Sequence, residues 1–325
     1  RTYENISREL TGLGHAVRLI TPEGHATVPL PGYRDIRIAM FPGGRVTQVV
    51  QDFSPDAIHI GTEGPLGNAA RSYCLRRNLP FTTAYHTRFP EYIRLRAPVP
   101  TRWTYTWLRR FHRPARRTMV PTHTQKQHLG AKGLKNIVIL GRGVNTDLFH
   151  PRDDSPFDLP RPVHLYLGRV AVEKNIEAFL DLDLSGSKVV VGDGPALTSL
   201  QKRYPDAHFT GLRFGEDLAR CLAGADVFVF PSRTDTFGIV MLEAMACGVP
   251  VAAYPVAGPR DVVRQGVTGW LDENLAVAIQ KALRMDPTAC VTYAAGHSWQ
   301  SVAQSFLEML VPVYSRVSLI HHHAA

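Results

Sequence analysis

The sequence predicts an α/β protein built from two doubly wound domains. Short runs of β-branched and aliphatic residues alternate with segments of helical periodicity through the 325 residues. The strand runs are apolar throughout, as in parallel sheets that are covered by helices on both faces. A stretch rich in Pro and Asp, residues 151–162, has no periodicity and predicts a linker. We therefore expect domains at residues 1–150 and 163–325, with a cleft between them.

The first predicted domain begins with a helical pattern, in which Ile6, Leu10 and Leu13 share one face. A βα fold normally places a strand before its first helix, so we expect the first strand of this domain to be missing. Strands are predicted at Val17–Ile20, Ile36–Ala39, Ala57–Ile60, Phe81–Ala84, Thr118–Val120 and Ile137–Leu140. Helices are predicted between most of them, including Leu66–Arg77 and Thr122–Ala131.

The second predicted domain repeats this alternation. Its strands are predicted at Val163–Leu167, Lys188–Val191, His208–Thr210, Val227–Phe230 and Val249–Ala252. Its helices are predicted at Asn175–Leu182, Ala196–Tyr204, Gly215–Ala223 and Gly238–Cys247. Ligands of such domains bind beyond the carboxyl ends of the strands, and this sequence places its unusual polar residues and glycines there.

Composition limits the class of protein. Hydrophobic residues make up 44% of the chain, too many for a disordered protein, and no run of 18 apolar residues predicts a membrane-spanning helix. The four cysteines contain no C-x-x-C pair, which argues against a zinc site or a disulfide framework. Free, buried thiols are typical of a reducing compartment, so we expect a cytoplasmic protein.

The net charge of +9 is concentrated in the first half of the chain. Residues 1–160 contain 23 Lys and Arg against 12 Asp and Glu, whereas residues 161–325 contain 14 against 16. Between Arg88 and Arg117, arginines are interleaved with Trp, Tyr and Phe, which is typical of a helix on anionic lipid. The arginines predicted to face a membrane are Arg109, Arg110, Arg113, Arg116 and Arg117. A solvated helix with core aromatics and single-stranded nucleic-acid binding are the alternatives.

One binding motif follows the strand Val163–Leu167. Gly168 allows close approach of a ligand to the backbone, and the helix start beyond it offers free N–H groups to an anion. Arg169 and Lys174 add two positive charges, so the motif suits a diphosphate that is held without a metal ion. The alternative is a capping loop with solvated charges.

A second motif contains Gly192 and Gly194 before Pro195. These residues predict a tight turn, which either contacts a nucleotide or only joins a strand to a helix. No G-x-G-x-x-G follows a strand, so a dinucleotide site lacks its fingerprint.

A third motif is a loop with Asp235, Phe237 and Gly238 that leads into a helix carrying Glu243. Free N–H groups near Gly238 can bind a phosphate or a sugar hydroxyl. Glu243 lies among apolar residues, and a buried carboxylate needs a partner. That partner is either the diol of a ribose or a core arginine.

The order G-R-x-x-x-E-K-N, G-D-G-P, acid-x7-Glu and A-M-A-C-G-V-P-V-A-A resembles glycosyltransferase family 4. The resemblance covers essentially the whole chain. It implies the glycosyltransferase B fold, two facing Rossmann-like domains, and a retaining, metal-independent hexosyltransferase. Thr62–Gly67 and Tyr85–Tyr92 resemble the subgroup of bacterial GDP-mannose-dependent α-mannosyltransferases and of glycolipid or sulfolipid synthases.

The resemblance also implies roles for the motif residues. Arg169 and Lys174 stabilise the diphosphate leaving group, and Glu243 binds the donor ribose. The other donor-binding residues implied are Gly168, Gly192, Gly194, Phe237 and Gly238.

Two further residues are expected to act on the transferred sugar. Asp235 contacts this sugar, and His86 lies over it from the first domain. Asp235 stands where the family usually has glutamate, a side chain one methylene longer, which leaves the identity of the sugar open.

The donor implied by the resemblance is a GDP- or UDP-linked hexose of the mannose or glucose type, with no cofactor. The acceptor is a lipid or a glycan at the inner face of the membrane, where the protein binds peripherally. Nucleic acid is not an expected partner. Two other functions remain open: a non-hydrolysing nucleotide-sugar epimerase, and an inactive basic module that binds membranes or nucleic acid.

Overall fold

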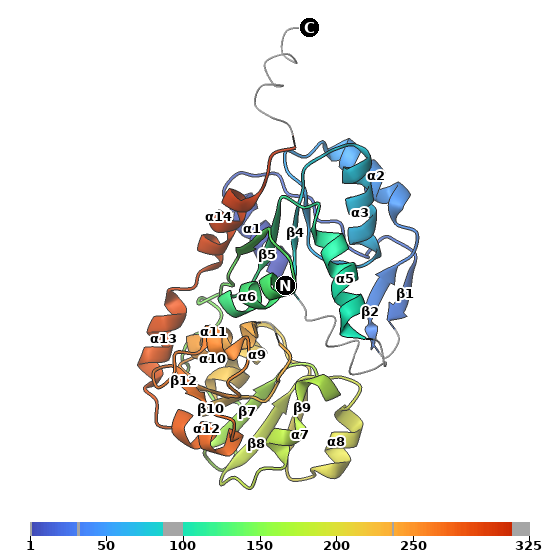
Figure 1. Cartoon of the computed structure of the whole chain (residues 1–325). Coiled ribbons are helices and arrows are strands. Elements are labelled where there is room, and N and C mark those ends of the chain that lie inside the picture. Colours follow the sequence, from blue (N-terminus) through green and yellow to red (C-terminus); the bar gives the residue numbers. More distant parts are fainter. Residues whose placement is uncertain (1, 31–32, 87–99, 236, 314–325) are drawn as a thin grey trace. The chain divides into compact units, whose positions relative to one another are not determined.

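The structure is a computed structural model that describes residues 2–30, 33–86, 100–235 and 237–313 (Figure 1). The chain divides into two compact units, Arg1–Gly141 with Val302–Ala325 and Arg142–Ser301. Each unit contains a parallel sheet with helices, so the predicted α/β class is confirmed. No helix within the described ranges has both the length and the apolar character needed to cross a membrane.

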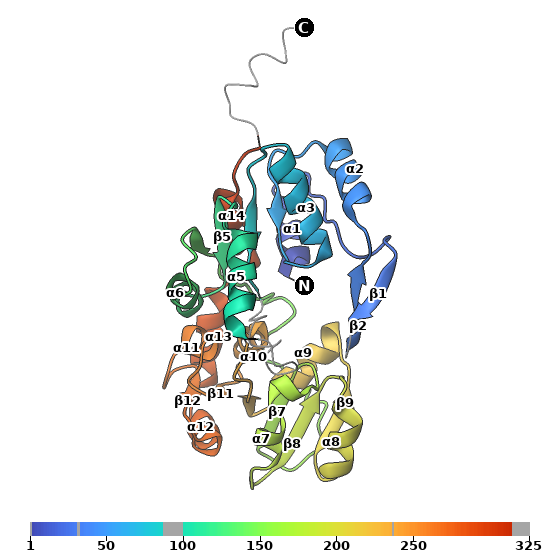
Figure 2. The ribbon, with the colours of Figure 1, turned by 45° about the vertical axis from the view of Figure 1, so that its right-hand side comes forward.

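The first unit contains a parallel sheet in the order β3-β4-β5-β6. Its strands are β3 (His59–Ile60), β4 (Thr82–Ala84), β5 (Arg117–Val120) and β6 (Ile137–Ile139). Its helices are α1 (Thr2–Gly12), α2 (Gly43–Phe53), α3 (Pro65–Arg76), α5 (Thr101–His112) and α6 (His123–Ala131). An antiparallel hairpin of β1 (Thr27–Leu30) and β2 (Tyr33–Ala39) stands apart from this sheet in both views (Figures 1 and 2).

The predicted strand Val17–Ile20 is wrong, because residues 15–20 have no regular structure and are mostly exposed. Among the described strands none pairs with this segment, so it lacks the ladder hydrogen bonds that define a strand. Strand β1 was not predicted, because Pro29 interrupts its short apolar run.

The second unit contains a parallel sheet in the order β12-β11-β10-β7-β8-β9. Its strands are β7 (Val163–Leu167), β8 (Ser187–Val191), β9 (His208–Gly211), β10 (Val227–Phe230), β11 (Val251–Ala253) and β12 (Gly269–Leu271). Its helices are η1 (Val172–Lys174), α7 (Glu177–Leu180), α8 (Leu197–Arg203), α9 (Gly215–Ala223), α10 (Ile239–Ala246), α11 (Pro259–Val262), α12 (Leu275–Ala282) and α13 (Pro287–Ala295). The strand order reverses between β7 and β10, which is where doubly wound sheets bind ligands. Helix α8 lies at the β9 edge and α12 at the β12 edge (Figures 1 and 2).

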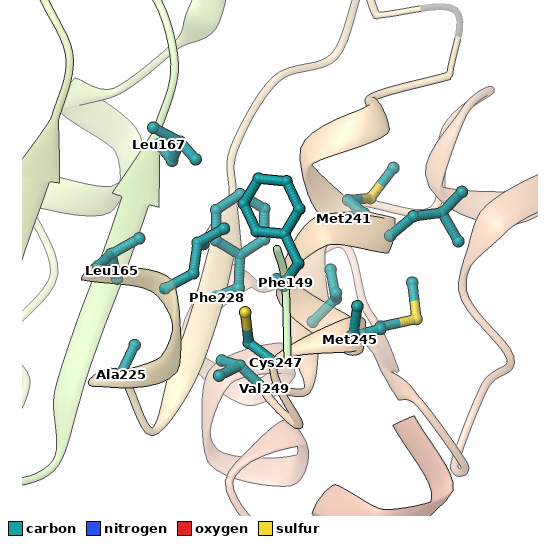
Figure 3. Packing of buried hydrophobic residues seen from close by; sticks show 14 of the residues in the cluster. Phe149, Leu165, Leu167, Ala225, Phe228, Met241, Met245, Cys247 and Val249 are labelled. Atoms are coloured by element: carbon teal, nitrogen blue, oxygen red, sulfur yellow. The ribbon is translucent and has the colours of Figure 1, made fainter. Parts of the chain in front are cut away.

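The division between the units differs from the predicted one at both ends. Phe149 packs in the core of the second unit, beside Phe228 and the methionines Met241 and Met245 of α10 (Figure 3). The second unit therefore begins before residue 150 and includes the predicted linker, residues 151–162.

Helix α14 (Trp299–Met309) carries the chain back to the first unit. The ring of Phe306 lies 6.4 Å from that of Tyr3 and 4.9 Å from that of His59, centroid to centroid. Beyond the helix, the Val313 N–H donates to the carbonyl of Asp56. These contacts are long-range, so local periodicity could not reveal them.

All four cysteines are free and buried, as predicted. Burial raises the pKa of Cys290 to about 12, with a smaller contribution from the charge of Asp286. Thiols with such pKa values stay protonated and unreactive at neutral pH.

Candidate functional site

The loops after β7 and β8 pack against each other backbone to backbone. The Gly168 N–H donates to the Val191 carbonyl at 3.0 Å, and the Val170 N–H donates to the Asp193 carbonyl at 2.9 Å. A Cβ at residue 192 would lie 1.9 Å from the Gly168 oxygen, and one at residue 194 would lie 2.3 Å from the Val170 oxygen. Both glycines are therefore needed for packing, and their contact with a nucleotide stays a prediction.

Lys174 and Asp235 form an ion pair at the switch point of the sheet. The Lys174 ammonium donates to both carboxylate oxygens of Asp235, at 2.7 and 2.9 Å. The two side chains are 20% and 18% exposed, so water screens the pair less than it does a surface pair. The sequence motifs predicted both residues but not their contact, because they are 61 positions apart.

Two further hydrogen bonds join the loops that carry this pair. Asn175 adopts a left-handed conformation with φ 55°, and its side-chain amide donates to the Pro231 carbonyl at 3.0 Å. The Thr234 hydroxyl donates to the Glu173 carbonyl at 3.3 Å. The loop after β7 and the loop after β10 are thus fixed to each other on both sides of the ion pair.

Helix α10 begins beside this pair. Gly238, the N-cap, has φ 76°, and among the described residues no side chain caps the helix there, so its first N–H groups can bind an anion. A Cβ at residue 238 would lie 2.7 Å from the Phe230 ring and 2.9 Å from the Met241 methyl, so glycine is required. Phe237 is half-buried against the apolar core.

Glu243 is buried on α10, with an exposed fraction of 4%. Its negative charge contributes to the raised pKa of Cys247, which lies one turn further along the chain. Burial raises the pKa of Cys247 to about 12, the charge of Arg152 opposes this rise, and the charge of Glu243 adds to it. Glu243 is therefore placed as predicted, within the helix and below the surface.

Arg169 is half-buried in the loop after β7, where its carbonyl accepts a hydrogen bond from the Tyr166 hydroxyl at 2.8 Å. Arg169, Lys174, Asp235 and Glu243 all belong to loops or helices that follow strands of the second sheet. Among the described residues, no group of three or more His, Cys, Asp or Glu side chains could hold a metal ion.

His86 belongs to the first unit and follows β4. Its Nε2 lies 2.5 Å from the Tyr3 hydroxyl, which also lies 2.8 Å from Nε2 of His59. Sequence reasoning missed Tyr3 and His59. For Tyr3 the available signal was helical spacing, which places it on the same helix face as the buried Ile6 and Leu10.

Helix α5 exposes the aromatic and basic face that its sequence predicts. Trp103 and Trp107 are 63% and 38% exposed, and Arg110 lies next to them on the same face. The opposite face is buried and consists of Tyr105, Leu108, Phe111 and His112. We use the name α5 patch for the exposed residues of α5 and of the segment that follows it, which are Trp103, Trp107, Arg110, Arg113 and Arg116.

The five predicted arginines are not equivalent. Arg110, Arg113 and Arg116 are exposed. Arg109 and Arg117 are half-buried and donate to the backbone carbonyls of Lys132 and Glu308, at 3.0 and 2.8 Å. Arg88, Arg94 and Arg96 lie outside the described residues.

Two family models match the chain. Residues 1–148 match the family described as Glycosyltransferase Family 4, and residues 161–285 match Glycosyl transferases group 1. The two matches correspond closely to the two α/β sheets.

Curated relatives agree with the family matches. A GDP-mannose-dependent alpha-mannosyltransferase of Mycobacterium tuberculosis is 34% identical over 241 residues, which are 71% of this chain and 63% of that protein. A sulfoquinovosyl transferase of Arabidopsis thaliana is 29% identical over 309 residues, 83% of this chain and 59% of that protein. The chain thus spans about three fifths of the length of each of these relatives.

Among solved structures, the fold resembles sucrose-phosphate synthase from Thermosynechococcus elongatus. The TM-score is 0.72 at 23% identity, over 94% of this chain and 91% of the other. At this identity the likeness concerns the fold alone.

Proposed function

The chain belongs to the glycosyltransferases, with a family 4 domain followed by a group 1 domain, and from this premise we propose that it transfers a hexose from a nucleotide-diphosphate sugar to a lipid or glycan acceptor. The observation that carries the proposal is the Lys174–Asp235 ion pair at the switch point of the second sheet. The pair supports the proposal because a cation suited to a phosphate lies one hydrogen bond from a carboxylate suited to a sugar hydroxyl.

The proposed donor is a GDP- or UDP-linked hexose of the mannose or glucose type. Arg169 and Lys174 bind its diphosphate, and the N–H groups at the start of α10 add to this anion site. Glu243 accepts hydrogen bonds from the ribose hydroxyls, and its burial at 4% exposure strengthens the charge-assisted hydrogen bonds that its carboxylate makes. Asp235 and His86 contact the hexose.

The proposed reaction retains the configuration at the anomeric carbon and needs neither metal nor cofactor. The bond from C1 to the β-phosphate oxygen breaks, and the acceptor oxygen bonds to C1 on the same face. The hydroxyl proton of the acceptor passes to the departing phosphate. Negative charge grows on this phosphate during bond breaking, so Arg169 and Lys174 stabilise the transition state more than the bound donor.

We further propose that the acceptor is reached at an anionic membrane surface on the cytoplasmic side, where the α5 patch binds peripherally. Exposed tryptophans beside exposed arginines support this, since indole rings insert at the headgroup level and guanidinium groups attract anionic lipid.

The decisive experiment supplies the full-length protein with GDP-mannose or UDP-glucose, anionic lipid vesicles and EDTA. We expect release of nucleotide diphosphate and an α-linked product, identified by the proton coupling at C1. Turnover lost with EDTA and restored by Mg²⁺ would contradict the roles of Arg169 and Lys174. Conversion of one nucleotide sugar into another without an acceptor would instead identify an epimerase.

A further inference from the structure

A pocket of about 490 Å³ lies at the amino-terminal edge of the first sheet. One wall consists of residues 74–75 and 78–81, where the chain passes from α3 to β4. The other wall consists of residues 113–116, where the chain passes from α5 to β5. Doubly wound sheets bind their substrates at the carboxyl ends of the strands, so this pocket lies at the other edge.

The two walls of the pocket are fixed to each other. The Arg116 N–H donates to the Phe81 carbonyl at 2.9 Å, which joins the segments before β4 and β5. Asn78 turns the chain after α3 in a left-handed conformation with φ 53°, and the Leu79 N–H donates to the Cys74 carbonyl at 2.9 Å. Cys74 and Phe81 belong to a buried apolar cluster, so the base of the pocket is part of the core. The pocket is therefore preformed, as ligand sites usually are.

The charge around the pocket is positive. Arg113 and Arg116 line the pocket and are exposed. Four more arginines belong to α3, to α5 or to the residue that follows α3, and they are Arg71, Arg76, Arg77 and Arg110. Within the described ranges, none of these six arginines forms an ion pair with Asp or Glu. Burial lowers the pKa of Arg71, and the positive charge of Arg110 lowers it further, so like charges repel each other here. Such a cluster attracts anions.

The end of α5 opposes this attraction only weakly. The carboxyl end of a helix carries about half a negative charge, against a whole positive charge on each guanidinium group. Arg71 also reduces the effect, because its side chain donates to the carbonyls of Phe111 and Arg110 at 2.9 and 2.8 Å. The same two hydrogen bonds hold α3 against α5. The positive charges therefore dominate at the pocket.

We propose that this pocket binds the phosphate group of a phosphate ester through Arg113 and Arg116, with the Asn78 side chain as a further donor. Guanidinium groups match the oxygens of a phosphate in a bidentate geometry, and an apolar base strengthens the attraction by excluding water. The site is separate from the residues proposed to bind the donor diphosphate, which belong to the second unit. Only the source of the phosphate, a lipid headgroup or a soluble ester, rests on the proposed membrane contact of the α5 patch.

The first test is isothermal titration of the full-length protein with glycerol phosphate. Saturating GDP and UDP are present, so that Arg169 and Lys174 are occupied. We expect one binding site, and we expect Arg113→Gln with Arg116→Gln to raise its Kd at least tenfold, because both changes remove charged donors. Wild-type protein that binds no glycerol phosphate would overturn the proposal.

The matched control is Arg110→Gln, compared with Arg113→Gln alone. Both residues are exposed and carry the same charge, but Arg110 does not line the pocket. Arg113→Gln should raise the Kd for glycerol phosphate several times more than Arg110→Gln does. Equal effects would show a diffuse attraction to the basic surface and would overturn the pocket. Melting curves of the variants show whether a lost affinity reflects unfolding.

Vesicles distinguish the two sources of the phosphate. A lipid headgroup is the ligand if phosphatidylglycerol vesicles displace glycerol phosphate from the wild-type protein, and a soluble ester is the ligand if they do not. Trp103→Ala should weaken vesicle binding but leave the Kd for glycerol phosphate unchanged, because Trp103 does not line the pocket.

The outcomes separate this proposal from the proposed function. Glycerol phosphate that binds through Arg113 and Arg116 supports the pocket even if the protein transfers no hexose. Conversely, hexose transfer by a protein that binds no glycerol phosphate would overturn the pocket and leave the proposed function intact.

Discussion

Lys174 and Asp235 have separate roles in the sequence motifs, yet their side chains meet at 2.7 Å. The Lys174 ammonium also donates to the second carboxylate oxygen, at 2.9 Å, so the position of each group depends on the other. Under the proposed function the pair would link the two ends of the donor, because Lys174 is proposed to bind the diphosphate and Asp235 to contact the hexose.

At this scale we predict different effects for the two partners. Lys174→Met should weaken nucleotide-diphosphate binding by about 1.5–3 kcal/mol, because it removes a charged hydrogen-bond donor to phosphate. Asp235→Asn should lower kcat while changing this affinity little. Isothermal titration with GDP and UDP, followed by steady-state assays, measures both quantities.

The control breaks an ion pair that has only a surface role. Arg203→Gln removes the contact between Arg203 and Glu177. The side chains of these two residues are 59% and 54% exposed, and such surface pairs contribute little to the free energy of unfolding. Equal losses of affinity and melting temperature in Lys174→Met and Asp235→Asn would show that the half-buried Lys174–Asp235 pair is structural rather than ligand-binding.

At the scale of single elements, the segment from α5 to the start of β5 contains exposed arginines and half-buried arginines that donate to backbone carbonyls, which allows a matched comparison. Arg113→Gln with Arg116→Gln should weaken binding to phosphatidylglycerol vesicles by roughly 30-fold, at about 1 kcal/mol for each residue. Arg109→Gln with Arg117→Gln removes the same charge, but from half-buried side chains that donate to backbone carbonyls. This second pair should therefore weaken binding less.

Vesicle sedimentation at rising salt measures both effects, since exposed charges are screened over about 10 Å at 0.1 M. Wild-type protein that stays in the supernatant at low salt would contradict membrane binding by the α5 patch. A soluble glycan would then be the better acceptor to test.

Elements with strong periodicity were predictable, and the exceptions have physical causes. Helix α9 and strands β7 and β10 have the predicted bounds, because each is a continuous pattern that packs as expected. The predicted helix Asn175–Leu182 shrinks to Glu177–Leu180, since Asn175 turns into a left-handed conformation to bond the Pro231 carbonyl. That bond, like the Lys174–Asp235 pair, joins loops of different strands, so no local pattern contains it.

The whole molecule consists of two α/β units. The first unit is formed by two separate stretches of the chain, whereas the second is formed by one continuous stretch. The boundary predicted at 150 missed the core position of Phe149, and the C-terminal domain predicted to run to 325 missed the return of α14. Linkers are predicted from composition, whereas unit membership depends on which core an apolar side chain enters. The motifs of the site could be predicted from the sequence because each lies within one short segment. The unit to which α14 belongs could not be predicted, because it depends on long-range contacts.

This return predicts where a change in α14 acts. Phe306→Ala removes a buried ring and should cost about 3–5 kcal/mol, in the first unit rather than the second. Hydrogen exchange should show lost protection in β3 and β4 but not in β7 and β8. Leu307→Ala, at a neighbouring exposed position, is the control and should change little. Loss of protection confined to the second unit would contradict the assignment of α14.

The close approach of the loops after β7 and β8 also limits how this protein can be re-engineered. A library diversified at residues 192 and 194 would consist almost wholly of members that cannot close these loops, because any Cβ there overlaps a carbonyl oxygen. Directed evolution of sugar preference should therefore vary Thr234 and Phe237, which are half-buried on the adjoining loop and have side chains to exchange. The glycine loops would then keep their backbone conformation while the side chains of the adjoining loop are varied.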